Sequence, residues 1–319
     1  MSFGRPYIMK TKGCIHDGWL VLHQPKVDPD YLYHALSSDL VFSQFDRLAA
    51  GSTVRNLNIG LAKSVEIPFP PLPEQRRIVV ILDEAFAGIA TAKDTAEQNR
   101  QNARTLFESH LNYVFTPKDK GWGEKKLGAL YKIGSSKRVL KSEWKTKGVP
   151  FYRGREITRL AAAGYVNNEL FISEAHFADL SKEYGVPKAG DIVITAIGTI
   201  GNSHVVRQSD RFYFKDASVL WMKRTTDVSS EFIRYWLKSS LFFDQLDRGN
   251  GATVDTLTIQ KLQSVELRLP QLEEQKRIVA ALDALSAETA RLSSHYARKL
   301  ELLEELKKSL LHQAFAGQL

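Results

Sequence analysis

The sequence predicts an α+β protein with one complete and one partial globular domain and two long helices that pair with each other. Three observations support this fold class: an internal repeat with a period of 200 residues, a heptad pattern after each copy, and a stretch between them rich in glycine, aromatic and β-branched residues. These features divide the chain into a partial domain, a connector with the first long helix, a complete domain, and a connector with the second long helix. Their bounds are 1–50, 51–117, 118–250 and 251–319.

The first segment, residues 1–50, has the pattern of only the second half of such a domain. Strands are expected over residues 7–9 and 19–23, followed by a helix over residues 31–45. The stretch 4–8 can also be aligned, weakly, with residues 201–205. The sequence therefore predicts a small α+β fragment ahead of the first connector.

The internal repeat is the clearest signal in the chain. Residues 51–83 and 251–283 align without a gap, and 17 of the 33 positions are identical. Both copies begin with Gly-x-Thr and contain Pro-x-Leu-x-Glu-Gln-x-Arg-Ile-Val, in which the proline ends one element and a helix then begins. A period this long indicates a two-part protein and not a solenoid.

Each connector continues into a long helix. Apolar and small residues recur in alternating steps of four and three, which predicts about 40 helical residues with a seam that packs against a partner. The first seam has smaller side chains than the second, which favours packing of one helix on the other; the alternative is that each helix is buried in its own domain. The seam positions are 78, 82, 85, 89, 92, 96, 99, 103 and 106, and those 200 residues later.

The segment 118–250 carries the signals of a complete α+β domain. Turn-forming residues, notably 188–191 and the Gly-Thr-Ile-Gly turn at 198–201, separate its strand candidates. An amphipathic helix is expected over residues 229–246, with a serine as its N-cap. The strands are expected over residues 149–153, 191–197, 204–206, 211–215 and 219–222.

The positive charge of the chain is concentrated in this domain. The formal net charge is +8, and residues 116–159 hold 13 lysines and arginines against 4 acidic side chains. Residues 1–115 and 251–319 are each neutral on the same count. A local excess of this kind indicates a surface that faces a polyanion, and the alternative is a solvated basic face that keeps the protein soluble.

Several functional classes find no support in the sequence. The chain has one cysteine, Cys14, which excludes an internal disulfide and fits a reducing cytoplasm. The longest aliphatic run, residues 78–82, is far shorter than the roughly 20 residues of a membrane span, and no secretory signal is recognised. We find no phosphate-binding loop, no amino-methyltransferase tetrapeptide and no histidine pattern for a metal.

The paired connectors and their heptad helices resemble the specificity subunits of type I restriction–modification systems, and the resemblance covers essentially the whole chain. The stretches 148–153 and 190–201 are similar to the recognition domain of that family. The resemblance implies two target recognition domains, an antiparallel coiled coil as a spacer, and reading of a bipartite site on double-stranded DNA. It also implies that methyltransferase and restriction (nuclease and translocase) subunits are partners. The first recognition domain is expected to lack the equivalent of about residues 122–198.

In this interpretation the chain is not an enzyme and binds no cofactor, and S-adenosylmethionine belongs to the partner methyltransferase. Basic and polar residues in loops are candidates for DNA contacts, because lysine and arginine neutralise phosphates and arginine reads guanine. The DNA-binding candidates are Ser136, Lys137, Arg138, Arg153, Arg155, Thr199, Gly201 and Asn202. The resemblance implies docking of partner subunits at Glu74, Gln75, Arg77, Glu274, Gln275 and Arg277.

Two alternatives stay open at this point. The chain could be a truncated regulatory or assembly variant, which pairs with methyltransferase subunits or self-associates as a homodimer without reading a full bipartite site. It could also be an unrecognised enzyme, in which case the isolated chain would methylate or cleave DNA.

Overall fold

The computed structural model describes five stretches of the chain: residues 3–16, 18–48, 58–116, 121–246 and 256–319. They form two compact units. Unit 1 comprises Met1–Ala103 and Ala290–Leu319, and unit 2 comprises Arg104–Thr289. Each unit contains part of both long helices. The predicted segment boundaries near residues 50, 117 and 250, and the repeat residues Gly51, Thr53, Gly251 and Thr253, lie outside the described residues.

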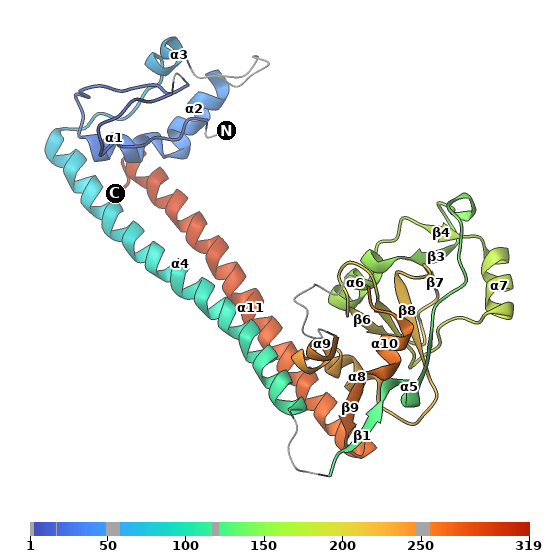
Figure 1. Ribbon diagram of the computed structural model, residues 1–319. Coiled ribbons are helices and arrows are strands. Elements are labelled where there is room, and N and C mark those ends of the chain that lie inside the picture. The colour runs from blue at the N-terminus through green and yellow to red at the C-terminus, as the bar shows by residue number, and fades with distance from the viewer. Residues whose placement is uncertain (1–2, 17, 49–57, 117–120, 247–255) are drawn as a thin grey trace. The chain divides into compact units, whose positions relative to one another are not determined.

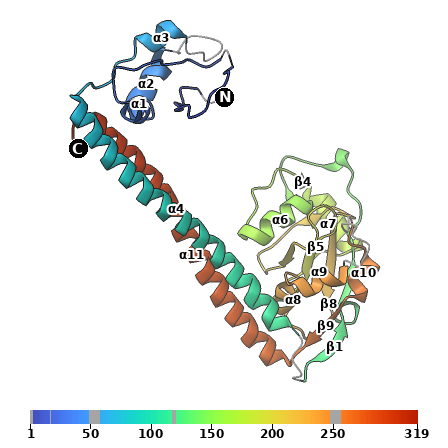
Figure 2. The ribbon, with the colours of Figure 1, turned by 60° about the vertical axis from the view of Figure 1, so that its left-hand side comes forward.

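The two long helices are α4 (Leu72–Phe115) and α11 (Leu272–Phe315), and each has 44 residues. In unit 1 they lie side by side and run in opposite directions (Figures 1 and 2). The guanidinium of Arg77, near the start of α4, donates to the backbone carbonyl of Leu319 at 2.7 Å, and Lys93 forms an ion pair with Glu304. The predicted antiparallel pairing is therefore confirmed.

The predicted seam is correct over most of its length. Ile78, Leu82, Ile89, Ala96 and Ala103 of α4 are buried. The last position of the pattern is wrong in both copies, because Leu106 and Leu306 are 53% and 47% exposed; Lys299 is exposed as well. In α4 the buried strip continues instead through Phe107, Leu111 and Phe115, which pack on the core of unit 2. A straight helix drifts away from a strict heptad repeat, and this drift moves the contact face by one residue.

Unit 2 contains three small sheets. A four-stranded antiparallel sheet has the order β2-β8-β5-β6, a three-stranded sheet has the order β4-β3-β7, and β1 pairs with β9. The strands are β1 (Gly123–Lys126), β2 (Tyr131–Gly134), β3 (Val149–Tyr152), β4 (Phe171–Ile172), β5 (Ile192–Thr195), β6 (Ser203–Val205), β7 (Tyr213–Phe214), β8 (Val219–Arg224) and β9 (Glu266–Leu269). The five predicted strands correspond to β3, β5, β6, β7 and β8.

Both faces of the four-stranded sheet are covered. One face, with Ile194 and Met222, packs against Phe232 in the largest apolar cluster. The other face, with Val193, packs against Ile157. The covering helices are α6 (Gly154–Ala163), α8 (Ser230–Trp236) and α9 (Ser240–Leu246), which Figure 2 shows. The other helices described in unit 2 are α5 (Leu127–Leu130), α7 (Glu174–Glu183), α10 (Ile259–Ser264) and η1 (Lys141–Glu143).

Two predicted single helices are each two helices. Residues 229–246 form α8 and α9, and residues 31–45 fall within α1 (Pro29–Leu36) and α2 (Asp39–Leu48). A buried serine lies at each break: the Ser38 hydroxyl donates to the carbonyl of Ala35, and the Ser239 hydroxyl donates to that of Trp236. Amphipathic periodicity continues across the break, so the sequence pattern alone did not show it.

The strands predicted over residues 7–9 and 19–23 are absent from the described part of unit 1, which adds only the short helix α3 (Ile59–Lys63) to α1 and α2. Their apolar side chains are exposed, for example 72% for Tyr7 and 67% for Val21. A strand persists only where a neighbour accepts its backbone hydrogen bonds. In unit 2 that neighbour for both β6 and β8 is β5, and unit 1 has no described counterpart of it. Among the described residues no helix is both long and apolar enough to cross a membrane.

Candidate nucleic-acid interface

The loop after β2 carries the first group of predicted DNA-binding residues. The Ser136 hydroxyl donates to the carbonyl of Phe214 at 2.7 Å, and the backbone N–H of Lys137 donates to the Tyr213 hydroxyl at 3.0 Å. Burial raises the pKa of Tyr213, and the hydrogen bond from Lys137 acts in the opposite direction. The Lys137 ammonium lies 5.2 Å from the centre of the Tyr184 ring, and Arg138 is exposed. The loop backbone is thus fixed and both cations remain accessible.

The second group, Arg153 and Arg155, surrounds a buried carboxylate at the start of α6. Glu156 is 2% exposed; it accepts hydrogen bonds from the side chains of both arginines and from the backbone N–H of Arg153. Burial alone raises the pKa of Glu156, but these hydrogen bonds outweigh burial and leave the pKa below its usual value. Arg155 also pairs with Glu169 at 2.6 Å. Two carboxylates therefore balance two guanidinium groups, and the pair adds little long-range attraction for DNA.

The third group lies in the Gly-Thr-Ile-Gly turn between β5 and β6. Thr199 is exposed at its tip. Gly201 has a φ of +91°, and a Cβ there would lie 2.8 Å from the Phe243 ring, so this glycine is required for packing. The Asn202 side chain donates to the Thr158 hydroxyl at 3.1 Å, and its backbone N–H donates to that of Thr195 at 3.0 Å. Gly201 and Asn202 are engaged in internal contacts, which leaves Thr199 as the accessible candidate.

The structure brings the second and third groups together. A Cβ on Gly154, between the two arginines, would lie 3.9 Å from the carbonyl of Ile197 at the start of the turn. The contact of Asn202 with Thr158 ties the same turn to α6. The loop of Ser136 contacts β7, which pairs with β3 on its other side. The eight candidates therefore form two neighbouring groups within one unit.

The residues predicted to bind partner subunits divide into buried and exposed ones. Gln75 and Gln275 are 2% and 4% exposed, and each joins the connector to a helix N-cap. The Gln75 side chain accepts from the N–H of Asp28 at 2.8 Å and donates to the carbonyl of Pro70 at 2.8 Å. Gln275 does the same with Ser229 and Pro270, both at 2.9 Å. Their amides are therefore engaged inside each unit and are not available on its surface.

The other four docking candidates are accessible. Glu74 forms an ion pair with Arg77, and Glu274 forms one with Arg277; in each pair the partners are three residues, or about one helical turn, apart. The hydrogen bond from Arg77 lowers the pKa of Glu74. These two exposed ion pairs occupy equivalent positions at the starts of α4 and α11, so the two connectors present a similar local surface, to which unit 1 adds the bond from Arg77 to the Leu319 carbonyl. Within the described stretches no cluster of three His, Cys, Asp or Glu side chains could hold a metal ion.

The profile of one protein family covers most of this chain. It is described as the type I restriction modification DNA specificity domain, and it matches residues 2–98 and 119–302. The chain belongs to this family.

Individual members of the specificity family are similar to this chain over most of its length. A provisionally named type I restriction enzyme specificity subunit of Haemophilus influenzae is 29% identical over 266 residues, which are 81% of this chain and 64% of the relative. The EcoBI specificity subunit of Escherichia coli is 24% identical over 324 residues, 93% of this chain and 67% of that protein. The chain thus spans about two thirds of the length of these curated relatives.

Solved structures show the same fold. A chain from a structure of the type I restriction–modification system superposes with a TM-score of 0.75 at 22% identity, and covers 92% of this chain and 72% of that one. The HsdS subunit from Thermoanaerobacter tengcongensis gives a TM-score of 0.61 at 22% identity, with 92% and 71% covered. The predicted combination of recognition domain and long paired helices is therefore confirmed as the fold of this specificity-family chain.

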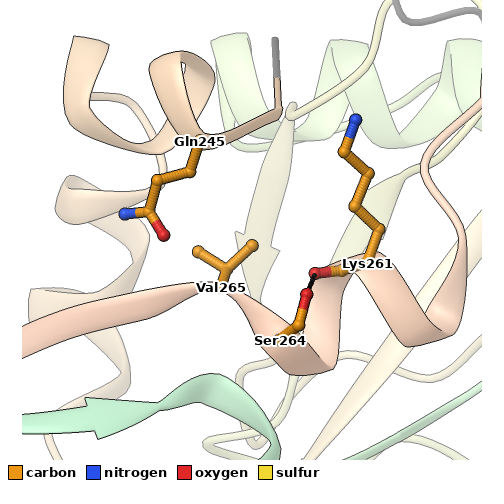
Figure 3. A pocket seen from close by; sticks show the side chains of 4 residues that line it. All are labelled: Gln245, Lys261, Ser264 and Val265. Carbon is orange, nitrogen blue, oxygen red and sulfur yellow. Dashed lines mark hydrogen bonds between the residues drawn. The ribbon is translucent and has the colours of Figure 1, made fainter. Parts of the chain in front are cut away.

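Sequence reasoning missed a second set of matched contacts in this specificity-family chain. Asp83 accepts from His34 in unit 1, and Asp283 accepts from the Tyr235 hydroxyl in unit 2. The Gln245 amide bonds both backbone groups of Glu266, as Gln44 does with Glu66. Figure 3 shows Gln245 beside a small hollow that Lys261, Ser264 and Val265 also line. The shared Gln, Ser-Val-Glu and Leu-Asp strings of the repeat were the available signal.

Proposed function

We propose that this chain is the DNA-reading specificity subunit of a type I restriction–modification complex. In this role it directs partner methyltransferase and restriction subunits to a DNA sequence and performs no chemistry of its own. The observation that carries the proposal is the pairing of a complete recognition fold in unit 2 with two equivalent connectors on antiparallel helices. A cytoplasmic location and S-adenosylmethionine on the partner methyltransferase belong to the same proposal.

The charge distribution supports DNA as the ligand. Lys137 and Arg138 are exposed, and neither forms an ion pair with any described residue. Such cations release counterions from the phosphate backbone, which gives attraction that does not depend on sequence. The turn of Thr199 lies next to the start of α6, where the guanidinium groups of Arg153 and Arg155 are held by Glu156. Polar groups of defined position are what contact with base edges requires. In this proposal Lys137 and Arg138 attract the DNA backbone, and the second and third groups of residues contact the bases.

The connectors support a role in assembly. Glu74–Arg77 and Glu274–Arg277 are exposed, rigidly placed on helix starts, and equivalent in the two units. Two copies of one partner subunit would therefore find the same local surface twice. We expect methyltransferase subunits to use these surfaces.

Sequencing of methylated bases tests the proposal in cells that express this chain with its methyltransferase partner. A bipartite methylation motif that is lost when the chain is deleted is the expected result. A palindromic motif would indicate that two copies of unit 2 read the site as a homodimer. The absence of any motif, with the complex assembled, would overturn the reading function and favour an assembly role. Methylation or cleavage by the isolated chain with S-adenosylmethionine and Mg²⁺ would overturn the non-catalytic role.

A further inference from the structure

The strand pair β2–β8 places two lysines directly opposite each other. In its register Lys132 faces Lys223, and both side chains are exposed. Residues opposite each other in an antiparallel pair have Cβ atoms about 5 Å apart, and like charges there destabilise the sheet. Neither lysine forms an ion pair with a carboxylate among the described residues. The strand pair therefore carries an unfavourable contact that the fold itself does not need.

A second strand pair of unit 2, β1–β9, has the opposite arrangement. In β1–β9, Glu124 faces Arg268 and Lys126 faces Glu266, so both charged pairs are complementary. The Lys126 ammonium lies 3.6 Å from the Glu266 carboxylate. The same domain thus pairs opposite charges across one sheet and like charges across another, which indicates that the lysine pair serves something outside the chain.

Aromatic rings accompany the lysine pair. Trp221 lies two residues before Lys223 on the same face of β8, and the Lys223 ammonium is 5.9 Å from the centre of its ring. The indole N–H donates to Asp191, which is buried beneath this surface, at 2.9 Å. A Cβ on Gly185 would lie 3.5 Å from the Trp221 ring, so the neighbouring Tyr184, 43% exposed, belongs to the same surface.

These contacts define a lysine–aromatic face, which consists of Lys132, Lys137, Tyr184, Trp221 and Lys223. Its three ammonium groups have no ion-pair partner among the described residues, and two of them lie over aromatic rings. The sheet fixes the backbone of Lys132, Trp221 and Lys223, and the hydrogen bond that the Trp221 indole donates to Asp191 holds its ring. Of the two rings, Tyr184 is exposed and Trp221 is half-buried against the cluster of Ile157 and Val193. A rigid face with uncompensated cations and accessible ring surface suits a phosphodiester backbone, because phosphates neutralise the cations and sugars or bases contact the rings.

We propose that the lysine–aromatic face is a contact surface for the phosphate backbone of nucleic acid, in addition to the two loop groups described above. The proposal rests on the proposed DNA-binding function and names residues for it. Bound phosphate would relieve the repulsion between Lys132 and Lys223. The strand pair β2–β8 is therefore less stable in the free protein than in the complex, where bound phosphate offsets the repulsion.

The test measures binding and stability on the same variant of the full chain. A labelled mixed-sequence DNA duplex is titrated with wild-type protein and with the double variant Lys132→Gln/Lys223→Gln at several salt concentrations. We expect affinity at low salt to fall roughly tenfold, and the slope of log affinity against log salt to decrease by about 0.9 for each lost phosphate contact. Thermal unfolding of the variant should occur at the same or a higher temperature, because the like-charge contact is gone.

A matched control removes the same number of charges elsewhere. Lys125→Gln/Lys126→Gln lies on β1, where Lys126 is paired with Glu266, and should retain both affinity and salt slope. The single change Lys223→Glu gives Lys132 an opposite partner, so stability should rise while DNA affinity falls. A purely structural role for these lysines would not move the two quantities in opposite directions.

The outcomes separate the two proposals. If the double variant binds DNA with wild-type affinity and slope, or if the β1 control loses as much, the lysine–aromatic face is not a phosphate contact, and the lysines serve solubility or an acidic protein partner. Salt-dependent binding by the wild-type chain would still uphold the proposed function. If the wild-type chain shows no salt-dependent DNA binding at all, the proposed function fails first.

Discussion

In both units the globular part packs on the long helices through matched contacts, but the rest of the globular part differs between the units. In unit 1, Tyr31 of α1 packs edge-on against Phe315 at the end of α11, with ring centres 5.3 Å apart. In unit 2, Phe232 of α8 packs in the same way against Phe115 at the end of α4, at 5.1 Å. The glutamine and aspartate contacts of the connectors also match. Each unit thus contains the start of one long helix and the end of the other.

Apart from these matched contacts with the long helices, the two units differ. Counting back from the N-caps Asp28 and Ser229, Val21 occupies the position of Met222, yet Val21 is 67% exposed and Met222 is fully buried. Met222 lies on β8 between β2 and β5, whereas the stretch around Val21 has no described strand beside it. The attachment to the long helices is therefore independent of the four-stranded sheet of unit 2, so different folds can be built on one attachment.

The sharpest test of this difference compares the two matched positions. Met222→Ala should lower the free energy of unfolding by about 2–5 kcal/mol, because it leaves a cavity in the largest apolar cluster. Val21→Ala should change it by less than about 0.5 kcal/mol, as for other exposed positions. Urea denaturation followed by circular dichroism measures both. Equal losses at the two positions would mean that residues 18–23 are packed, and the comparison would be wrong.

A second difference concerns alkaline pH. Burial raises the pKa of Tyr131 in unit 2 to about 12, against about 10 for an exposed tyrosine. The folded state therefore favours the neutral phenol: its stabilisation is complete below pH 10 and is lost as pH rises from 10 to 12. Two pKa units correspond to about 3 kcal/mol. Tyr131→Phe should remove this part of the alkaline loss, which unfolding at stepwise pH measures, whereas Tyr235, whose pKa burial also raises to about 12, keeps its own part. A variant with the full wild-type alkaline loss would contradict the assignment.

The connector glutamines test whether the matched contacts at the long helices contribute equally to the stability of both units. Gln75→Leu and Gln275→Leu each leave a buried N–H and a carbonyl without a partner, which should cost about 1–3 kcal/mol in either unit. Hydrogen exchange at α1 and α8 would locate the loss in the expected unit. The exposed Gln101→Leu on α4 is the control. A loss of stability confined to one unit would show that the matched contacts are not equivalent in the two units.

The smallest effect is expected at the exposed connector pairs. Arg277→Ala should leave stability unchanged within error, since exposed ion pairs contribute little. Arg77→Ala also removes the hydrogen bond to the Leu319 carbonyl and should cost at most about 1 kcal/mol. If methyltransferase subunits dock there, each change should remove part of the co-purifying methyltransferase, and the double change should remove more than either one. Full retention of the partner by the double variant would refute docking at these residues.

The sequence predicted elements that depend on local pattern and missed those that depend on distant neighbours. Prolines and a long heptad pattern placed both 44-residue helices within a few residues. The expected strand around Val21 has suitable side chains but no described partner strand. Among the site residues, the guanidinium groups of Arg153 and Arg155 were chosen for their charge, which Glu156 and Glu169 together neutralise.

The lysine–aromatic face shows the same limit. Lys132 and Lys223 lie far apart in the sequence, and each is an ordinary exposed lysine on its own. Only the register of β2 against β8 places them opposite each other. The Gly-Thr-Ile-Gly turn was recognised correctly, but the packing of Gly201 on Phe243 depends on α9, and no local pattern announces it.

The position of Phe315 has a consequence for biosynthesis. The core of unit 1 joins Tyr31 and Leu82 to Leu311 and Phe315, which emerge from the ribosome long after the first helix has been made. Among the described residues, Leu282 is the last buried member of the largest apolar cluster of unit 2. The core of unit 1 therefore stays incomplete, although most of its chain is translated first, until the distal turns of α11 have been made.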